Sequence, residues 1–187
     1  MTPARRDRES QKANDERERG KKQNEDKFTG FTMGCNDGNG DPAACNSLGE
    51  WYLLMRSDVI SASRAFAPAC FEKLHPQSCL NIGRLMSSSG GKSALMAVQE
   101  TLPQALRTEI VGQPIDSQTA ILSEKAFFIG CEAGNADACA DGSRILLRSA
   151  ASNSSGGGGG NGGGGSGFGT SQASINSLQR AEKLLRH

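Results

Sequence analysis

Six cysteines constrain the fold of this chain more than any other feature of its 187 residues. They fall into three pairs of sequence neighbours, with nine, eight and seven residues between the partners. Helical patterns lead into the first member of each pair and away from the second. We interpret each pair as a disulfide that joins the end of one helix to the start of the next, and we name this unit a staple. The predicted staples are Cys35–Cys45, Cys70–Cys79 and Cys131–Cys139.

A staple requires the chain to reverse direction between its two cysteines. Within one continuous helix, partners eight to ten positions apart would be separated by about 12–15 Å, at about 1.5 Å per residue. A disulfide needs its two Cα atoms within about 7 Å of each other. Each cysteine pair therefore predicts a helix that ends, a tight turn and a second helix that begins.

The residues between the cysteines can supply that turn. Gly134 can take the left-handed conformation that ends a helix, and Asn135 or Asp137 can cap the next one. Between the middle cysteines there is no glycine, only His75–Pro76, so we expect that turn to differ in detail. The first pair repeats the glycine, cap and proline logic with Gly38, Asp41 and Pro42.

The cysteines have two other interpretations. Zinc binding would usually require Cys-x2–4-Cys pairs, which are absent, and the only histidines are His75 and His187. Reduced, inert core thiols would suit a cytosolic protein. A redox-active pair would favour Cys-x-x-Cys and a thiol of lowered pKa. We therefore expect no catalytic residue, no metal and no cofactor, while haem binding stays open.

Apolar residues at helical spacing predict a series of helices. In the first of them, Trp51, Tyr52 and Met55 are expected on the inner face. Asp58 is placed to cap the second helix. The predicted helices cover residues 42–55, 58–73, 76–87, 116–131 and 136–149.

The intervals between staples indicate an internal repeat of helix pairs. The first cysteines of the first two staples are 35 positions apart, and the second cysteines are 34 apart. The corresponding intervals to the third staple are 61 and 60, so an insertion of 26 residues lies within about 87–115. Inside it, apolar residues have the spacing of a short helix, although Pro103 interrupts them. These apolar residues are Leu95, Val98, Leu102 and Leu106.

Polar segments divide the rest of the chain. Residues 1–27 hold nine Lys or Arg and seven Asp or Glu, with few apolar side chains, so we expect a charged, disordered tail. The repeat domain is then expected over residues 28–187. It is interrupted by the insertion at about 87–115 and by a Gly-rich flexible stretch at 152–171. A last helix is expected over residues 175–185.

Composition excludes some functional classes and indicates a compartment. The net charge of +1 gives no electrostatic argument for nucleic acid, and no apolar run approaches the roughly 18 residues of a membrane span. Six cysteines without an orphan favour an oxidising compartment. The N-terminal residues show neither a secretory apolar region nor a matrix-targeting pattern. Either the cysteines stay reduced in the cytosol, or the protein is oxidised in a compartment that it reaches without a cleaved leader. In a eukaryote, the mitochondrial intermembrane space fits the second case, and we expect the protein there.

The repeated pattern resembles the Sel-one-like repeat, a tetratricopeptide-related helix pair in which Ala, Leu-Gly and Tyr mark the first helix. The cysteine-containing form is similar to the bacterial cysteine-rich, β-lactamase-like repeat class and to small disulfide-stapled proteins of the intermembrane space. The pattern departs from the family where Ser143 stands in place of the expected glycine. The matching residues are Cys45–Gly49, Trp51-Tyr52, Ala65-Phe66, Cys70, Cys79, Ile82-Gly83, Cys131, Gly134-Asn135, Asp137 and Cys139.

The resemblance implies an all-α fold, an α/α superhelix whose concave surface binds other proteins. It implies a non-enzymatic, monomeric scaffold, an assembly factor for respiratory-chain complexes such as cytochrome c oxidase, with no nucleic-acid partner. One alternative is a hydrolase of the β-lactamase-like class, for which Ser89-Gly-Gly-Lys92 supplies a Ser-x-x-Lys match. That match lacks the partner motifs, and we expect it to be a flexible loop. Another alternative is an adaptor of the cytosol or endoplasmic reticulum.

Overall fold

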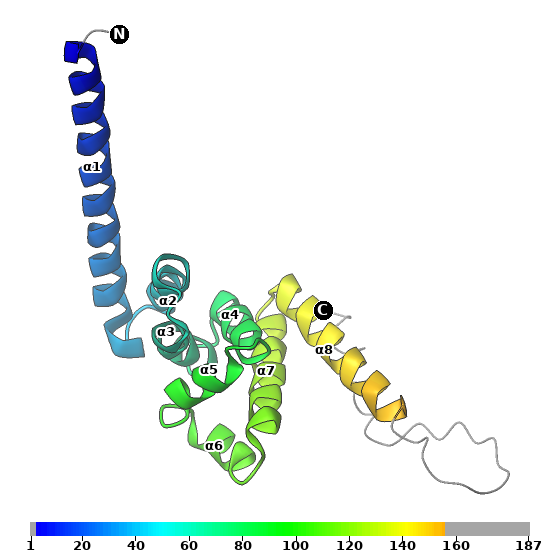
Figure 1. Ribbon diagram of the computed structural model, residues 1–187. Coiled ribbons are helices and arrows are strands. Elements are labelled where there is room, and N and C mark those ends of the chain that lie inside the picture. The colour runs from blue at the N-terminus through cyan, green and yellow to red at the C-terminus, as the bar shows by residue number, and fades with distance from the viewer. Residues whose placement is uncertain (1–2, 156–187) are drawn as a thin grey trace, which may run out of the picture.

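The computed structural model describes residues 3–155, and over this range the chain is entirely helical (Figure 1). Eight α-helices and one short 3₁₀ turn follow each other without a strand in this part of the chain. The predicted last helix and most of the Gly-rich stretch lie outside the described residues. The elements are α1 (Pro3–Cys35), η1 (Asn36–Gly38), α2 (Pro42–Arg56), α3 (Val59–Phe71), α4 (Pro76–Met86), α5 (Gly91–Val98), α6 (Gln104–Ile110), α7 (Ile115–Glu132) and α8 (Ala136–Ser155).

The N-terminal segment differs from its prediction, because α1 is one continuous helix where a disordered tail was expected. Lys, Arg, Glu and Gln have high intrinsic helix propensity, which favours a helix even where few apolar side chains can be buried. The first 25 residues of α1 extend from the body as an arm of about 37 Å, at about 1.5 Å per residue (Figure 1). Only its last turns contact the rest of the protein, through Phe28, Phe31 and Cys35.

The five predicted helices are present as α2, α3, α4, α7 and α8, with ends within a few residues of those expected, apart from α8, which runs six residues longer. Asp41 caps α2, accepting from the backbone N–H groups of Ala43 and Ala44, and Pro42 occupies the first helical position. Asp58 caps α3 in the same way by accepting from Ser61. Met55 is an exception to the predicted inner face, since 53% of its side chain is exposed at the end of α2.

Two close glycine–phenylalanine contacts hold the helix pairs together. A Cβ on Gly49 of α2 would lie 2.4 Å from the ring of Phe66 in α3. A Cβ on Gly83 of α4 would lie 2.8 Å from the ring of Phe127 in α7. Both rings are fully buried, so each glycine provides the space that a phenylalanine from the partner helix fills.

The insertion is an ordered part of the core. Pro103 separates it into α5 and α6, because proline cannot continue the helix that precedes it. Leu95, Val98, Leu102 and Ile110 are all at most 2% exposed and pack in the same cluster as residues of α3, α4 and α7. The short helix predicted from this apolar spacing is therefore present as α5, which fills the space between these three helices.

Candidate functional site

The structure joins the three predicted cysteine pairs. Their Cα–Cα distances are 4.4, 4.6 and 4.6 Å, and every cysteine is at most 8% exposed. Each bridge connects the last turn of one helix to the first turn of the next: α1 to α2, α3 to α4, and α7 to α8. Because the sulfurs are buried, the bridges form part of the packing between adjacent helices.

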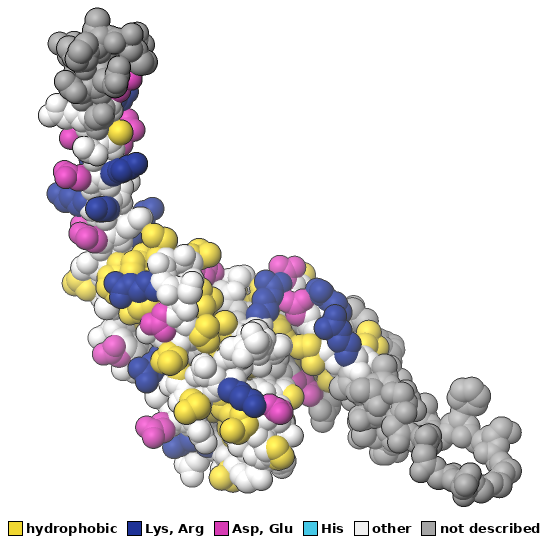
Figure 2. Space-filling model, viewed as in Figure 1, with side chains coloured by type: hydrophobic (Ala, Val, Ile, Leu, Met, Phe, Trp, Pro, Cys, Tyr) yellow, Lys and Arg dark blue, Asp and Glu magenta, His cyan; other side chains and the backbone are white. Residues whose placement is uncertain are grey.

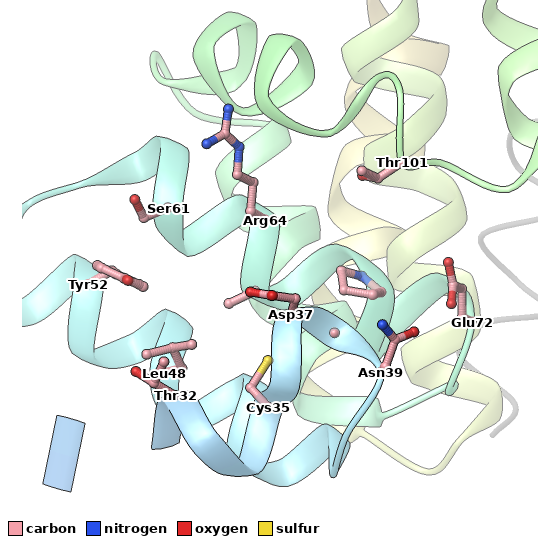
Figure 3. Close-up of a pocket in the computed structure, with 13 residues that line it drawn as sticks. Thr32, Cys35, Asp37, Asn39, Leu48, Tyr52, Ser61, Arg64, Glu72 and Thr101 are labelled. Carbon is pink, nitrogen blue, oxygen red and sulfur yellow. The ribbon is translucent and has the colours of Figure 1, made fainter. Parts of the chain in front are cut away.

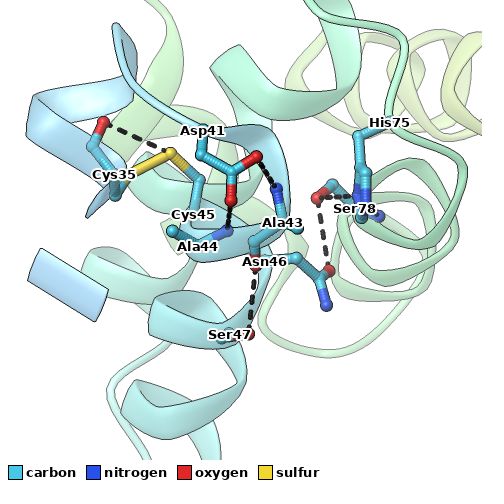
Figure 4. The surroundings of a disulfide bond; sticks show 9 residues. All are labelled: Cys35, Asp41, Ala43, Ala44, Cys45, Asn46, Ser47, His75 and Ser78. Carbon is cyan, nitrogen blue, oxygen red and sulfur yellow. Dashed lines mark hydrogen bonds between the residues drawn. A yellow bond between two sulfur atoms is a disulfide. The ribbon is translucent and has the colours of Figure 1, made fainter. Parts of the chain in front are cut away.

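All three staples share one backbone geometry. The N-cap residue of the second helix donates its backbone N–H to the carbonyl of the residue just before the first cysteine, over 2.8–2.9 Å. Its side chain accepts from the backbone N–H of the second helix's first turn. Figure 4 shows the side-chain part of this arrangement at the first staple, where the Asp41 carboxylate accepts from the backbone N–H groups of Ala43 and Ala44. The donor–acceptor pairs are Asp41–Gly34, His75–Ala69 and Asn135–Gly130.

Close approach of the helices depends on small residues beside the cysteines. A Cβ on Gly34 would lie 2.8 Å from the Cβ of Ala44, and one on Gly130 would lie 2.9 Å from the Cβ of Ala138. A small residue, Gly or Ala, directly precedes the first cysteine of every staple. This regularity is visible in the sequence and is an additional signal for a staple.

The middle turn differs from the others, as expected. Leu74 takes a left-handed conformation with φ of 55°, at the position where Gly134 has φ of 91° in the third turn. Such a conformation is unfavourable for leucine, and it is retained because the turn is fixed by the disulfide and by the cap. The Nδ1 atom of His75 accepts from the backbone N–H of Ser78, so this histidine serves as a helix cap.

A groove of about 490 Å³ lies beside the first staple, where α1, η1, α2 and α3 meet (Figure 3). Its apolar lining comes from Leu48, Tyr52, Ala65 and Pro68. Most of the remaining lining residues are polar, and Thr101 of the insertion also contributes. These polar residues are Thr32, Asp37, Asn39, Ser61, Arg64 and Glu72.

Three charged side chains of the groove are available to a ligand. The exposed Arg64 makes one contact, a 3.4 Å hydrogen bond from Nε to the carbonyl of Ala97. Within residues 9–148, no side chain forms an ion pair with Arg64, Asp37 or Glu72. An apolar floor with a polar edge has the same arrangement as a protein-binding surface, in which an apolar centre is surrounded by a polar rim.

An aromatic cluster fixes α1 at the edge of this groove. The ring of Phe28 lies 4.3 Å from Trp51 and 5.8 Å from Tyr52, measured between centroids, and the guanidinium of Arg56 covers Phe28 and Trp51 at 5.5 and 4.8 Å. Figure 2 shows apolar side chains gathered where the arm meets the body, and interspersed charges along the arm. Trp51 and Tyr52 are half-buried packing residues, and Tyr52 also contributes to the groove.

Polar contacts connect α2, α4 and α8 in series. Asn81 of α4 donates to Asn46 and Glu50 of α2, each over 3.1 Å. Arg84 of α4 forms a 2.6 Å ion pair with Asp141 of α8. These contacts fix the orientation of successive helix pairs, in addition to the staples.

The other predicted candidates do not assemble into a site within the described residues. Ser89 is exposed in the turn before α5, and the ammonium of Lys92 lies 3.6 Å from the carboxylate of Asp116 at the surface. Ser143 is buried and donates to the carbonyl of Cys139. His187 lies outside the described residues. Over residues 3–155 no group of three potential ligands is placed to hold a metal ion.

None of the helices in the described range is both long and apolar enough to cross a membrane. In comparisons with known proteins, no family model matches this chain, and no curated protein or solved structure matches it either. The geometry establishes an all-helical domain in which three disulfides link adjacent helices, with a groove beside the first of them.

Proposed function

We propose that this protein is a non-enzymatic scaffold that binds other proteins, and that the groove between α1, α2 and α3 is a binding surface. The observation that carries the proposal is the groove itself, hollowed to about 490 Å³ and lined by an apolar floor and unpaired charges, beside a buried disulfide. The Cys35–Cys45 bridge joins two of the helices that form its walls.

The staples support this function by holding the binding surface in place before a partner arrives. In the chain-entropy model, closing a loop of about ten residues stabilises the fold by about 2.5–3 kcal/mol. Binding to a surface that is already ordered avoids the free-energy cost of ordering it, which amounts to about 0.5–1.5 kcal/mol for each immobilised side chain. A stapled helical scaffold therefore suits the recognition of a partner protein.

Recurring contacts support membership of the Sel-one-like repeats. The Gly49–Phe66 and Gly83–Phe127 contacts occur at positions that the cysteine intervals make equivalent, and the same turn geometry recurs at all three staples. With six oxidised cysteines, this resemblance extends the proposal to the mitochondrial intermembrane space. There the cysteine spacing resembles that of cytochrome c oxidase assembly factor seven, and the chain would assist assembly of respiratory-chain complexes.

Site-specific photocrosslinking in cells tests the scaffold function. A photoreactive amino acid at Asn39, in the groove, is expected to yield discrete crosslinked protein bands, whereas the same amino acid at Arg107, exposed on α6, yields none. Fractionation with thiol alkylation would show where the crosslinked protein resides and whether its cysteines are closed. Equal crosslinking at both positions, or none at either, would contradict a binding role for the groove. Turnover of a chromogenic β-lactam would support the hydrolase instead.

A further inference from the structure

The groove beside the first staple has a counterpart in the second helix pair. The cysteine intervals place α1, α2 and α3 in correspondence with α3, α4 and α7. Residues that line the groove then align with residues around the second staple by offsets of 34, 35 or 61 positions. The aligned pairs are Leu48 with Ile82, Tyr52 with Met86, Ala65 with Ala126, Thr32 with Ala67 and Ser61 with Leu122.

The counterpart is filled by the chain's own insertion. Helix α5 contacts α3, α4 and α7, and its buried face consists of Ala94, Leu95 and Val98. These side chains belong to one apolar cluster with Ile82, Met86, Ala67, Leu122 and Ala126. A groove of this construction thus accepts a short amphipathic helix, here one that the same chain provides.

The charge at the edge of the counterpart is also satisfied by the insertion. Lys125 occupies the position equivalent to Arg64, and its Nζ lies 3.3 Å from the Oε2 of Glu109 in α6. In the first groove, no acidic side chain of the described residues reaches Arg64 in this way. The first groove therefore has a basic residue, Arg64, at the position of Lys125, but none of the described residues places an acidic side chain at the position of Glu109.

We propose that the first groove binds a short amphipathic helix of a partner protein in the manner in which α5 and α6 occupy the second. The helix presents small and aliphatic side chains at positions i, i+1 and i+4, and an acidic side chain that pairs with Arg64. Because Ser61 and Thr32 replace the leucine and alanine of the counterpart, the bound face is more polar than that of α5. This inference rests on the proposed scaffold function and specifies what the scaffold recognises.

Selection from a helical peptide library tests the inference on the full-length, oxidised protein. The probe is a phage-displayed library of 14-residue helices that keeps the i, i+1 and i+4 spacing of Ala94, Leu95 and Val98. It allows small, aliphatic and hydroxyl side chains at these three positions and randomises the remaining ones. Selected peptides are expected to carry an acidic residue at a common position. Their affinity, measured by fluorescence anisotropy, is expected to fall at least tenfold for two variants that alter exposed groove residues, Thr32→Trp and Arg64→Glu.

Charge reversal provides the decisive comparison. Exchanging the acidic residue of a selected peptide for lysine is expected to restore binding to Arg64→Glu, and Arg107→Glu is expected to bind the original peptide like the unmodified protein. Selection that returns no saturable binder, or binders insensitive to both groove variants, would overturn the inference. The scaffold proposal would survive that result if photocrosslinking at Asn39 still captured a partner. Far-UV circular dichroism and non-reducing electrophoresis confirm that each variant is folded and bridged.

Discussion

At the scale of single residues, helix caps and close contacts determine where each helix begins and how near it approaches its neighbour. The cap of α3 shows this most clearly. Asp58 accepts hydrogen bonds from the hydroxyl of Ser61 at 2.7 Å and from its backbone N–H at 3.0 Å. These bonds hold the pKa of the Asp58 carboxyl below its ordinary value, because they favour the charged form.

Replacing Asp58 by alanine is expected to lower the free energy of unfolding by about 1 kcal/mol at pH 7. A carboxyl whose pKa is lower in the folded state stabilises the fold above its unfolded pKa, and this contribution is lost as the pH falls through the folded pKa. The difference between the unmodified protein and Asp58→Ala should therefore shrink between pH 5 and about pH 2. Urea unfolding followed by circular dichroism at several pH values measures it, and a difference that does not change with pH would contradict the assignment.

The glycine–phenylalanine contacts predict a second effect. Gly49→Ala places a Cβ within 2.4 Å of a fully buried ring, so we expect a loss of about 1–3 kcal/mol from overpacking. Gly30→Ala is the matched control, because this helical glycine has no atom within 4 Å of its missing Cβ. Alanine there should stabilise by up to about 1 kcal/mol through helix propensity. Similar free energies of unfolding for the two variants would show that the close contact is absent.

The conformations of some turn and cap residues could be predicted from the sequence, and those of others could not. Gly38, Gly134, Asp41 and Asn135 have side-chain or backbone chemistry that few other residues share, so their turn and cap positions were predictable. Leu74 in a left-handed conformation was not, because no property of leucine favours it and only the surrounding turn imposes it.

At the scale of helices, hydrophobic periodicity predicted the helices that bury one face, but not the helix that has no buried face. The five amphipathic helices were predicted close to their observed bounds. The arm of α1 was missed, because its residues have high helix propensity and the helix has no buried face. In the insertion, the spacing of Leu95 and Val98 predicted a short helix but not its packing, which depends on contacts of α5 with α3, α4 and α7 that no local pattern contains.

The α1 helix provides a prediction at this scale. Removing residues 1–24 is expected to leave the free energy of unfolding unchanged to within about 1 kcal/mol, because the described side chains there are exposed. Phe28→Ala in the full-length chain should cost about 2 kcal/mol, since it removes the ring that packs on Trp51 and Tyr52. Denaturant unfolding of the two variants tests this. A larger loss from the truncation would mean that the arm packs against the body.

At the scale of the whole molecule, the staples link successive helix pairs into one unit, and the groove arises from that assembly. Its residues come from α1, η1, α2, α3 and the loop after α5, separated by up to 69 positions in the chain. The sequence predicted the bridges, because the cysteines fall in neighbouring pairs that are flanked by helical patterns and separated by turn residues. It did not predict the groove or the exposure of Arg64, since both depend on how helices distant in the chain are positioned.

Reduction of the disulfides gives the prediction for the assembly. Three staples, each worth about 2.5–3 kcal/mol, are together comparable with the roughly 5–15 kcal/mol that stabilises an ordinary domain. Adding reductant should therefore shift the midpoint of urea unfolding to much lower concentration, while a reductant-insensitive midpoint would mean that the bridges contribute little. Selected groove peptides should lose affinity under the same conditions.

The central claim is that bridges between sequence neighbours join consecutive helices into a fixed binding scaffold. Disulfide mapping by mass spectrometry, on protein alkylated at lysis and digested without reductant, tests it most directly. We expect three linked peptide pairs, Cys35–Cys45, Cys70–Cys79 and Cys131–Cys139, and no alkylated cysteine. Six alkylated thiols, or bridges between cysteines of different staples, would contradict it.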